Sequence, residues 1–184
     1  MQKKFYGTYI LIGVLFILAG LAYLFFAQPW SKKNTDTSIS FYQNFNQDSI
    51  NKIEIIKAGK TLTLTKENDK WTETSNDSEK KDADSSLIST MFSKLNAIKI
   101  NDPITETVDK QVLFNVDGSN VQVKMYNNNQ TVANFYIGKY TPDYNGNYIR
   151  QDGENKIYRT NGLILSYFDK ATFVKETTTN NVNQ

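Results

Sequence analysis

The feature that most constrains the fold is an unbroken apolar run over residues 5–27, FYGTYILIGVLFILAGLAYLFFA, which contains no charged residue. At a rise of about 1.5 Å per residue, a helix of this length measures roughly 34 Å. The hydrocarbon core of a bilayer is about 30 Å thick, so the run predicts a transmembrane helix. The rest of the chain is far more polar, and we expect one soluble domain behind one membrane-spanning helix.

The flanks of the run predict its orientation. A lysine pair at residues 3–4 favours an N-terminus in the cytoplasm, although a second pair at residues 32–33 weakens that preference. A cleaved signal peptide is the competing interpretation. The run is too long for a typical signal core, and Phe25 stands where cleavage after Ala27 would need a small residue. We therefore expect an uncleaved anchor with the domain on the extracytoplasmic side.

Small residues recur within the run. Gly7, Gly13 and Gly20 fall near one side of a helix, where glycine allows a second helix to approach closely. This pattern predicts packing against other membrane subunits. The alternative is that these glycines face lipid.

Four segments are expected along the chain: a stub and transmembrane helix over residues 1–27, a linker over 28–40, a soluble domain over 41–175 and a disordered tail over 176–184. The 21 basic and 19 acidic residues leave a net charge of +2, which the lysine pair at residues 3–4 accounts for. A neutral soluble domain argues against a nucleic-acid partner, which requires a clustered basic surface.

The composition also excludes several chemistries. The chain has no cysteine and no histidine, so thiolate catalysis, Ser-His-Asp triads and histidine zinc sites are impossible. No glycine-rich phosphate loop occurs. We expect no cofactor and no metal.

Alternating apolar residues predict antiparallel strands. Residues 53–56 and 61–65 alternate around an Ala58-Gly59 turn and predict a hairpin, with Trp71 on the buried face of a third strand. Residues 121–125 and 131–138 predict a second hairpin, and a third reverses at Asp152-Gly153.

One principal helix is expected between these strands. Asp82 and Asp84 can cap it, and one apolar stripe follows at three- and four-residue spacing: Leu87, Ile88, Met91, Leu95 and Ile98. Asn161 is expected to cap a short apolar turn over residues 163–168. The predicted fold class is therefore α+β, with one N-terminal transmembrane helix followed by a mostly antiparallel sheet and one principal packed helix.

The order of these segments resembles a known bacterial family, called domain of unknown function 4340. The likeness is carried by Trp71, the helix of Leu87 to Leu95, and the segments LFNVDGSNVQVKM, FYIGK, GNYIR and KIYRT before Phe168-Asp169-Lys170. The resemblance implies a membrane-anchored protein of the bacterial envelope, at the cytoplasmic membrane. Longer relatives often accompany ABC-type transport or gliding-motility components. No catalytic residues are defined for the family.

The loop over residues 140–154 is the most distinctive polar stretch. Asp143, Asn145 and Asn147 alternate possible calcium ligands, followed by Asp152 and Glu154, but no glutamate falls at the distance that a calcium loop requires. A hairpin loop is the favoured interpretation.

Three tyrosines in the same stretch are the candidate contact residues. Tyr140, Tyr144 and Tyr148 could stack on a glycan or contact a partner protein, because tyrosine combines a rigid apolar ring with one polar tip. The alternative is an ordinary role in strands.

Three functions remain as hypotheses. The leading one is a non-enzymatic, single-pass accessory subunit of a bacterial envelope membrane complex, whose domain contacts integral membrane subunits such as ABC-type transport components. The second is a membrane-tethered binding module for a cell-wall glycan or small ligand. The third, ranked last, is a carboxylate-dependent envelope hydrolase.

Overall fold

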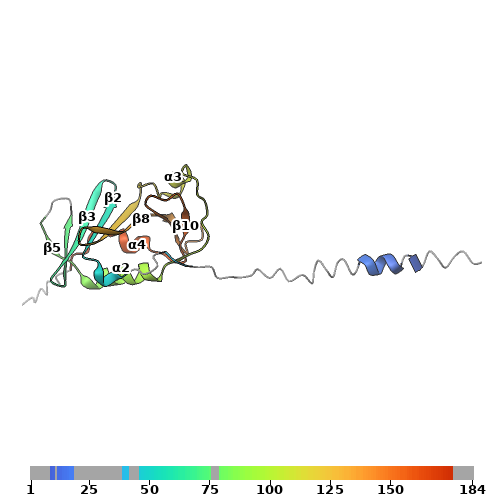
Figure 1. Ribbon diagram of the computed structural model, residues 1–184, viewed down its shortest axis with the longest axis horizontal. Helices are drawn as coiled ribbons and strands as arrows, with labels where there is room; N and C mark the ends of the chain where they lie inside the picture. The colour runs from blue at the N-terminus through green and yellow to red at the C-terminus, as the bar shows by residue number, and fades with distance from the viewer. Residues whose placement is uncertain (1–8, 11, 19–38, 42–45, 76–78, 176–184) are drawn as a thin grey trace, which may run out of the picture. The chain divides into compact units, whose positions relative to one another are not determined.

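The computed structural model describes residues 9–10, 12–18, 39–41, 46–75 and 79–175 (Figure 1). The chain divides into two compact units, Met1–Asp36 and Thr37–Gln184. The sheet, the named helices and the candidate site all belong to the second unit.

The first unit corrects the predicted fold class. Its described helical residues are 9–10 and 12–18. Within the described ranges, no helix is both long enough and apolar enough to cross a membrane. The predicted fold class, with its transmembrane helix over residues 5–27 and its single-pass architecture, is therefore corrected to a mostly antiparallel β-sheet with a few helices. The remaining residues of that predicted span lie outside the described residues.

The predicted glycine face falls on the same segment. A Cβ built on Gly13 would meet no atom within 4 Å, so no described neighbour packs closely there. Gly7 and Gly20 lie outside the described residues. The predicted tail over residues 176–184 and most of the predicted linker over 28–40 do so too.

The second unit contains an eight-stranded sheet in the order β10-β9-β8-β7-β2-β3-β4-β5, and all of its neighbouring strands pair antiparallel. Its strands are β2 (Lys52–Lys57), β3 (Lys60–Glu67), β4 (Lys70–Ser75), β5 (Lys81–Asp82), β7 (Val121–Asn127), β8 (Gln130–Tyr140), β9 (Asn147–Gln151) and β10 (Ile157–Arg159). A separate two-stranded sheet joins β1 (Ile39–Ser40) to β6 (Lys99–Ile100). The three predicted hairpins are confirmed as β2–β3, β7–β8 and β9–β10.

The predicted principal helix is α2 (Ser85–Ala97). Asp84 caps it, because its carboxylate accepts the Ser86 N–H at 2.8 Å, whereas Asp82 belongs to β5. Its buried stripe is Ile88, Met91, Phe92 and Leu95. The shorter helices are η1 (Gln47–Ser49), α3 (Lys110–Phe114) and α4 (Leu165–Phe168).

The sheet separates two apolar clusters of very different size. The main core lies on the side of α2 and α4 (Figure 1), where alternate strand residues such as Leu64, Trp71 and Phe135 are buried as the period-two pattern predicts. A smaller cluster of Val116, Tyr148 and Ile157 lies on the opposite face, with Phe114 and Tyr136 packed against it. Each face of β9 is therefore covered by a different part of the chain.

Both edges of the sheet are occupied. Beyond β10, the Ile104 N–H donates to the Ile157 carbonyl at 2.8 Å. Beyond β5, the Asp84 N–H donates to the Phe173 carbonyl at 2.7 Å. The Lys175 backbone N–H donates to the Asp82 carbonyl at 3.2 Å. These segments satisfy edge groups that could otherwise pair with another chain, so a contact site is expected on the loops.

Candidate functional site

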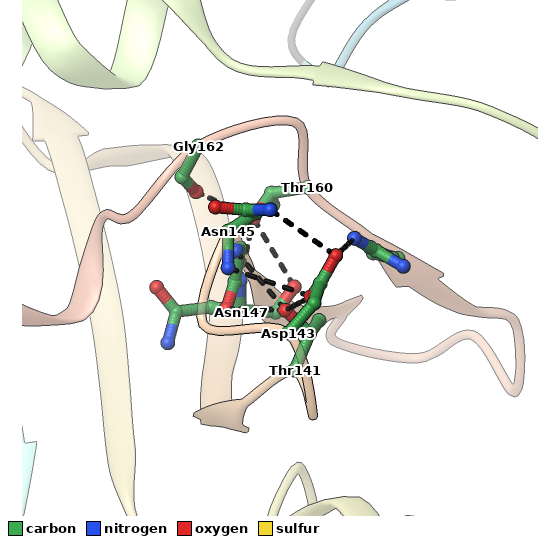
Figure 2. Close-up of polar contacts among 8 residues, drawn as sticks. Thr141, Asp143, Asn145, Asn147, Thr160 and Gly162 are labelled. Carbon is green, nitrogen blue, oxygen red and sulfur yellow. Dashed lines mark hydrogen bonds and ion pairs between the residues drawn. The ribbon is translucent and has the colours of Figure 1, made fainter.

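The connection from β8 to β9 is a compact turn, which we call the tyrosine turn (residues 140–146). The Thr141 N–H donates to the Gly146 carbonyl at 2.9 Å, and the Tyr144 N–H donates to the Thr141 carbonyl at 2.9 Å. The Thr141 hydroxyl, which is buried, donates to Asp143 Oδ1 at 2.7 Å and accepts the Gly146 N–H at 3.1 Å (Figure 2). These bonds fix the course of the turn.

Asp143 is the centre of this network. Its carboxylate accepts from the Thr141 hydroxyl, forms an ion pair with Arg159 of β10, and accepts from the Asn145 side chain at 3.4 Å. The Thr141 hydroxyl, with Arg159 beside it, lowers the pKa of Asp143 to about 2. Asp143 is therefore ionised at neutral pH, and its charge is used to hold the turn against β10.

Gly146 and Thr160 bring the turn close to the end of β10. A Cβ on Gly146 would lie 2.1 Å from the Thr160 carbonyl oxygen, so only glycine allows this approach. The Thr160 hydroxyl accepts the Asn147 N–H at 2.8 Å and donates to the Gly162 carbonyl at 2.8 Å (Figure 2). The base of the turn is thus joined to the residues that lead into α4.

Asn147 supports the site in a way that the sequence did not indicate. It is fully buried, and its Oδ1 accepts the backbone N–H groups of Ile164 and Leu165 at 2.9 and 3.1 Å. It therefore satisfies the start of α4, where Asn161 was predicted as the cap. Asn161 instead accepts the Lys99 N–H at 2.8 Å. Asn147 is 17 residues away from Ile164, and no local pattern links them.

Two of the three predicted tyrosines meet on the turn. Tyr140 is 40% exposed and Tyr144 is 72% exposed, with their ring centroids 6.3 Å apart and their planes inclined at 35°. Tyr144 has a φ of 55°, in the left-handed region. Tyr148 lies elsewhere, since it is buried in the smaller cluster with its ring centroid 4.4 Å from that of Phe114. The candidate surface is therefore the Tyr140–Tyr144 pair.

A cavity of about 460 Å³ adjoins the turn, and one residue of the turn lines it. Asn145 of the turn and Arg159, the partner of Asp143, line it together with Lys99 and Asn161. Amide and cationic groups supply hydrogen-bond donors here, and Asp102 adds an acceptor. Such a lining can hold a polar group of a ligand or partner next to the exposed rings.

The alternative calcium site is not assembled. Asn147 directs its Oδ1 to α4, and Asp152 accepts from the Asn134 amide at 2.7 Å and the Tyr136 hydroxyl at 2.9 Å. Across the described residues, no group of three or more acidic side chains could hold a metal ion. The arrangement around the turn is suited to contact and binding.

Comparison with known proteins adds a family. The family model described as "Domain of unknown function (DUF4340)" matches residues 78–180, which include α2, the second and third hairpins and the tyrosine turn. No curated protein and no solved structure matches the chain.

Proposed function

This chain belongs to the DUF4340 family, a domain of unknown function, and we propose that it is a non-enzymatic accessory subunit that binds a partner protein through its tyrosine turn. The observation that carries the proposal is the position of Tyr144, which is 72% exposed on a turn that is tightly hydrogen-bonded beneath it. A bacterial envelope complex is the setting that we propose for it. The proposal does not depend on a transmembrane helix.

The backbone at Tyr144 favours a functional role for the ring. A left-handed conformation costs a residue other than glycine roughly 1 kcal/mol, and its φ of 55° is such a conformation. The chain tolerates this cost and leaves the ring in solvent, where it contributes little to the core. Strain of this kind tends to occur where a side chain must be held in one position for binding.

The surroundings of Tyr144 resemble the composition of protein interfaces. Tyr140 lies beside it, and Arg159 lies at the adjoining cavity. Tyrosine and arginine are enriched among residues that dominate binding energy, because both combine large contact area with hydrogen bonding. A rigid turn also reduces the conformational entropy lost when a partner binds.

Site-specific cross-linking tests the proposal. A photoreactive amino acid at position 144 of the full chain would capture the neighbouring protein in intact cells, and the captured protein would then be purified and titrated against variants. We expect Tyr144→Ala to weaken that binding about tenfold or more, as for an interface anchor. Val132→Ala is the control, since Val132 lies on β8, outside the tyrosine turn, and is as exposed as Tyr140, at 40%. Equal binding by the Tyr144 variant and the wild type would contradict the proposal.

One observation favours a second candidate, a binding module for a cell-wall glycan. The cavity beside the tyrosine pair is lined by Asn145, Asn161 and Arg159, whose donors suit sugar hydroxyls while an aromatic ring stacks on the sugar face. NMR titration with soluble peptidoglycan fragments distinguishes the two. Shifts at the Asn145 and Asn161 side-chain amides that disappear in Tyr144→Ala would support the glycan module, and the absence of shifts would remove it.

A further inference from the structure

A second cavity, of about 580 Å³, lies far along the sheet from the tyrosine turn and shares no residue with the site described above. It opens between the β2–β3 hairpin, the end of β4 and the residues that follow α4. We call it the lysine cleft and define it by Ile55, Leu62, Phe168, Lys57, Lys60 and Lys170. Its volume is within the range typical of small-molecule sites, about 300–1,000 Å³.

The floor of the lysine cleft is the end of the main core. Ile55 and Leu62 face the core from neighbouring strands, where they are directly paired, and each is less than 8% exposed. Phe168, at the end of α4, also lines the cleft and is itself fully buried. The edges of Ile55 and Leu62 therefore give the floor of the cleft a narrow apolar surface on a packed core.

The rim of the cleft is cationic. Lys57, at the end of β2, forms an ion pair with Asp169 directly after α4, and this pair neutralises the acid at the rim. Lys60 and Lys170 form no ion pair with any residue that the structure describes. Three lysines and one aspartate thus give the lining an excess of two positive charges.

The apolar floor and the cationic rim of the cleft together favour one kind of ligand. We propose that the lysine cleft binds a small amphipathic carboxylate, whose charged group lies between Lys60 and Lys170 and whose apolar chain lies on Ile55 and Leu62. A neutral apolar molecule would leave the lysines unused, and a fully hydrophilic anion would make no use of the narrow apolar surface that Ile55 and Leu62 present at the floor. The site is independent of the proposed partner contact, because the two have no residue in common.

Octanoate is the probe for the test, in an NMR titration of the full ¹⁵N-labelled chain. We expect saturable shifts at the amides of Ile55, Leu62, Ser75 and Ala171, all of which line the cleft. Hexanoate, which has two methylenes fewer, should bind more weakly than octanoate, by up to roughly fourfold for each methylene that the cleft buries. Octan-1-ol, which has the same chain without the charge, should bind at least about tenfold more weakly.

Matched variants separate this site from general adsorption. Lys60→Gln with Lys170→Gln should weaken octanoate about tenfold, since each lysine contributes a solvent-screened contact. Lys110→Gln is the control, because Lys110 is an exposed lysine on α3 and away from the cleft. Both exchanges replace a lysine by a slightly shorter, neutral polar side chain and leave the core intact, so the variants should fold. The proposal is overturned if octanoate causes no shifts at the cleft, if octanol binds equally well, or if the double variant binds like the control.

Discussion

The main core and the tyrosine turn are both built on β8 and β9, yet different forces hold their side chains. In the core, Phe135 and Phe168 are fully buried, with ring centroids 5.9 Å apart in an edge-to-face arrangement. In the turn, hydrogen bonds and an ion pair around Asp143 fix the backbone, and Tyr144 remains in solvent. Burial of apolar surface fixes the side chains of the core, whereas hydrogen bonds and an ion pair fix the backbone of the turn.

Because of this difference, we expect the core to determine the stability of the domain and the turn to determine recognition. Burial of apolar surface is the dominant favourable contribution to folding, so the core should carry most of the free energy of unfolding. Exposed polar contacts contribute little net stability, but they can fix the position of a side chain. Substitutions in the two regions should therefore affect different measurements.

The largest effect is expected in the core. Phe168→Ala removes a fully buried ring that contacts Phe135 and lies beneath the lysine cleft, and it leaves a cavity that the strands cannot fill. We expect the free energy of unfolding to fall by about 3–5 kcal/mol. Urea denaturation followed by tryptophan fluorescence measures it, with Trp71 buried in the same core. A loss below about 1 kcal/mol would mean that this core does not hold the domain together.

The second-largest loss of stability is expected at Gly146, where the tyrosine turn approaches the end of β10. In Gly146→Ala the new methyl group would overlap the Thr160 carbonyl, so the backbone must move and strain of roughly 1–3 kcal/mol is expected. Gly162→Ala is the matched control, because its Cβ would lie at an ordinary 3.7 Å from Ile98. Thermal unfolding compares the two variants, and equal melting temperatures would show that the close approach at Gly146 is not needed.

The regular part of the fold could be predicted because its signals are local. Alternation in the segments around Leu62, Val123 and Phe135 indicated strands and their buried faces, and the stripe of α2 with Asp84 before it indicated a capped helix. The pairing of consecutive strands follows from short turns, so the three hairpins were also within reach of the sequence.

The remaining features depend on contacts between residues that are far apart in the sequence, or on properties that hydropathy does not measure. Asn147 satisfies the start of α4 across 17 residues, and Arg159 reaches Asp143 across 16, so neither could be found from spacing. The sequence alone grouped Tyr148 with Tyr144, although Phe114 at the end of α3 packs against Tyr148. The apolar run at residues 5–27 has the length and hydropathy of a membrane span, yet among the described residues no helix is long and apolar enough to cross a membrane.

The third prediction concerns the polar network of the turn and its dependence on pH. The pKa of Asp143 is lowered to about 2 in the folded chain, whereas an unperturbed aspartate titrates near 3.9. A lowered pKa means that the ionised group stabilises the fold above its ordinary pKa, and that this contribution is lost as the pH falls from about 4 to about 2. We expect the amide resonances of Tyr144 and Asn145 to shift in that window.

Asp143→Asn should remove this response. The amide cannot ionise, so the turn resonances of the variant should be nearly independent of pH between about 4 and 2. Asp117→Asn is the control, because Asp117 also has a lowered pKa but accepts from Ser119 in another turn. If the Tyr144 amide shifts equally in the wild type and in Asp143→Asn, Asp143 is not the group that holds the turn.

The smallest effect on stability is expected at Tyr144, where the proposed effect on binding is largest. Tyr144→Gly relieves a left-handed backbone that disfavours tyrosine, while the greater freedom of glycine in the unfolded chain acts in the opposite direction. Because the ring is 72% exposed, little buried surface is lost, and the free energy of unfolding should change by less than about 1 kcal/mol. Tyr148→Ala is the contrasting variant, since it removes a buried ring and should cost about 3 kcal/mol. Urea denaturation of both variants decides the comparison: a loss above about 2 kcal/mol for Tyr144→Gly would place its ring among the residues that stabilise the fold and remove the argument that it is held for recognition.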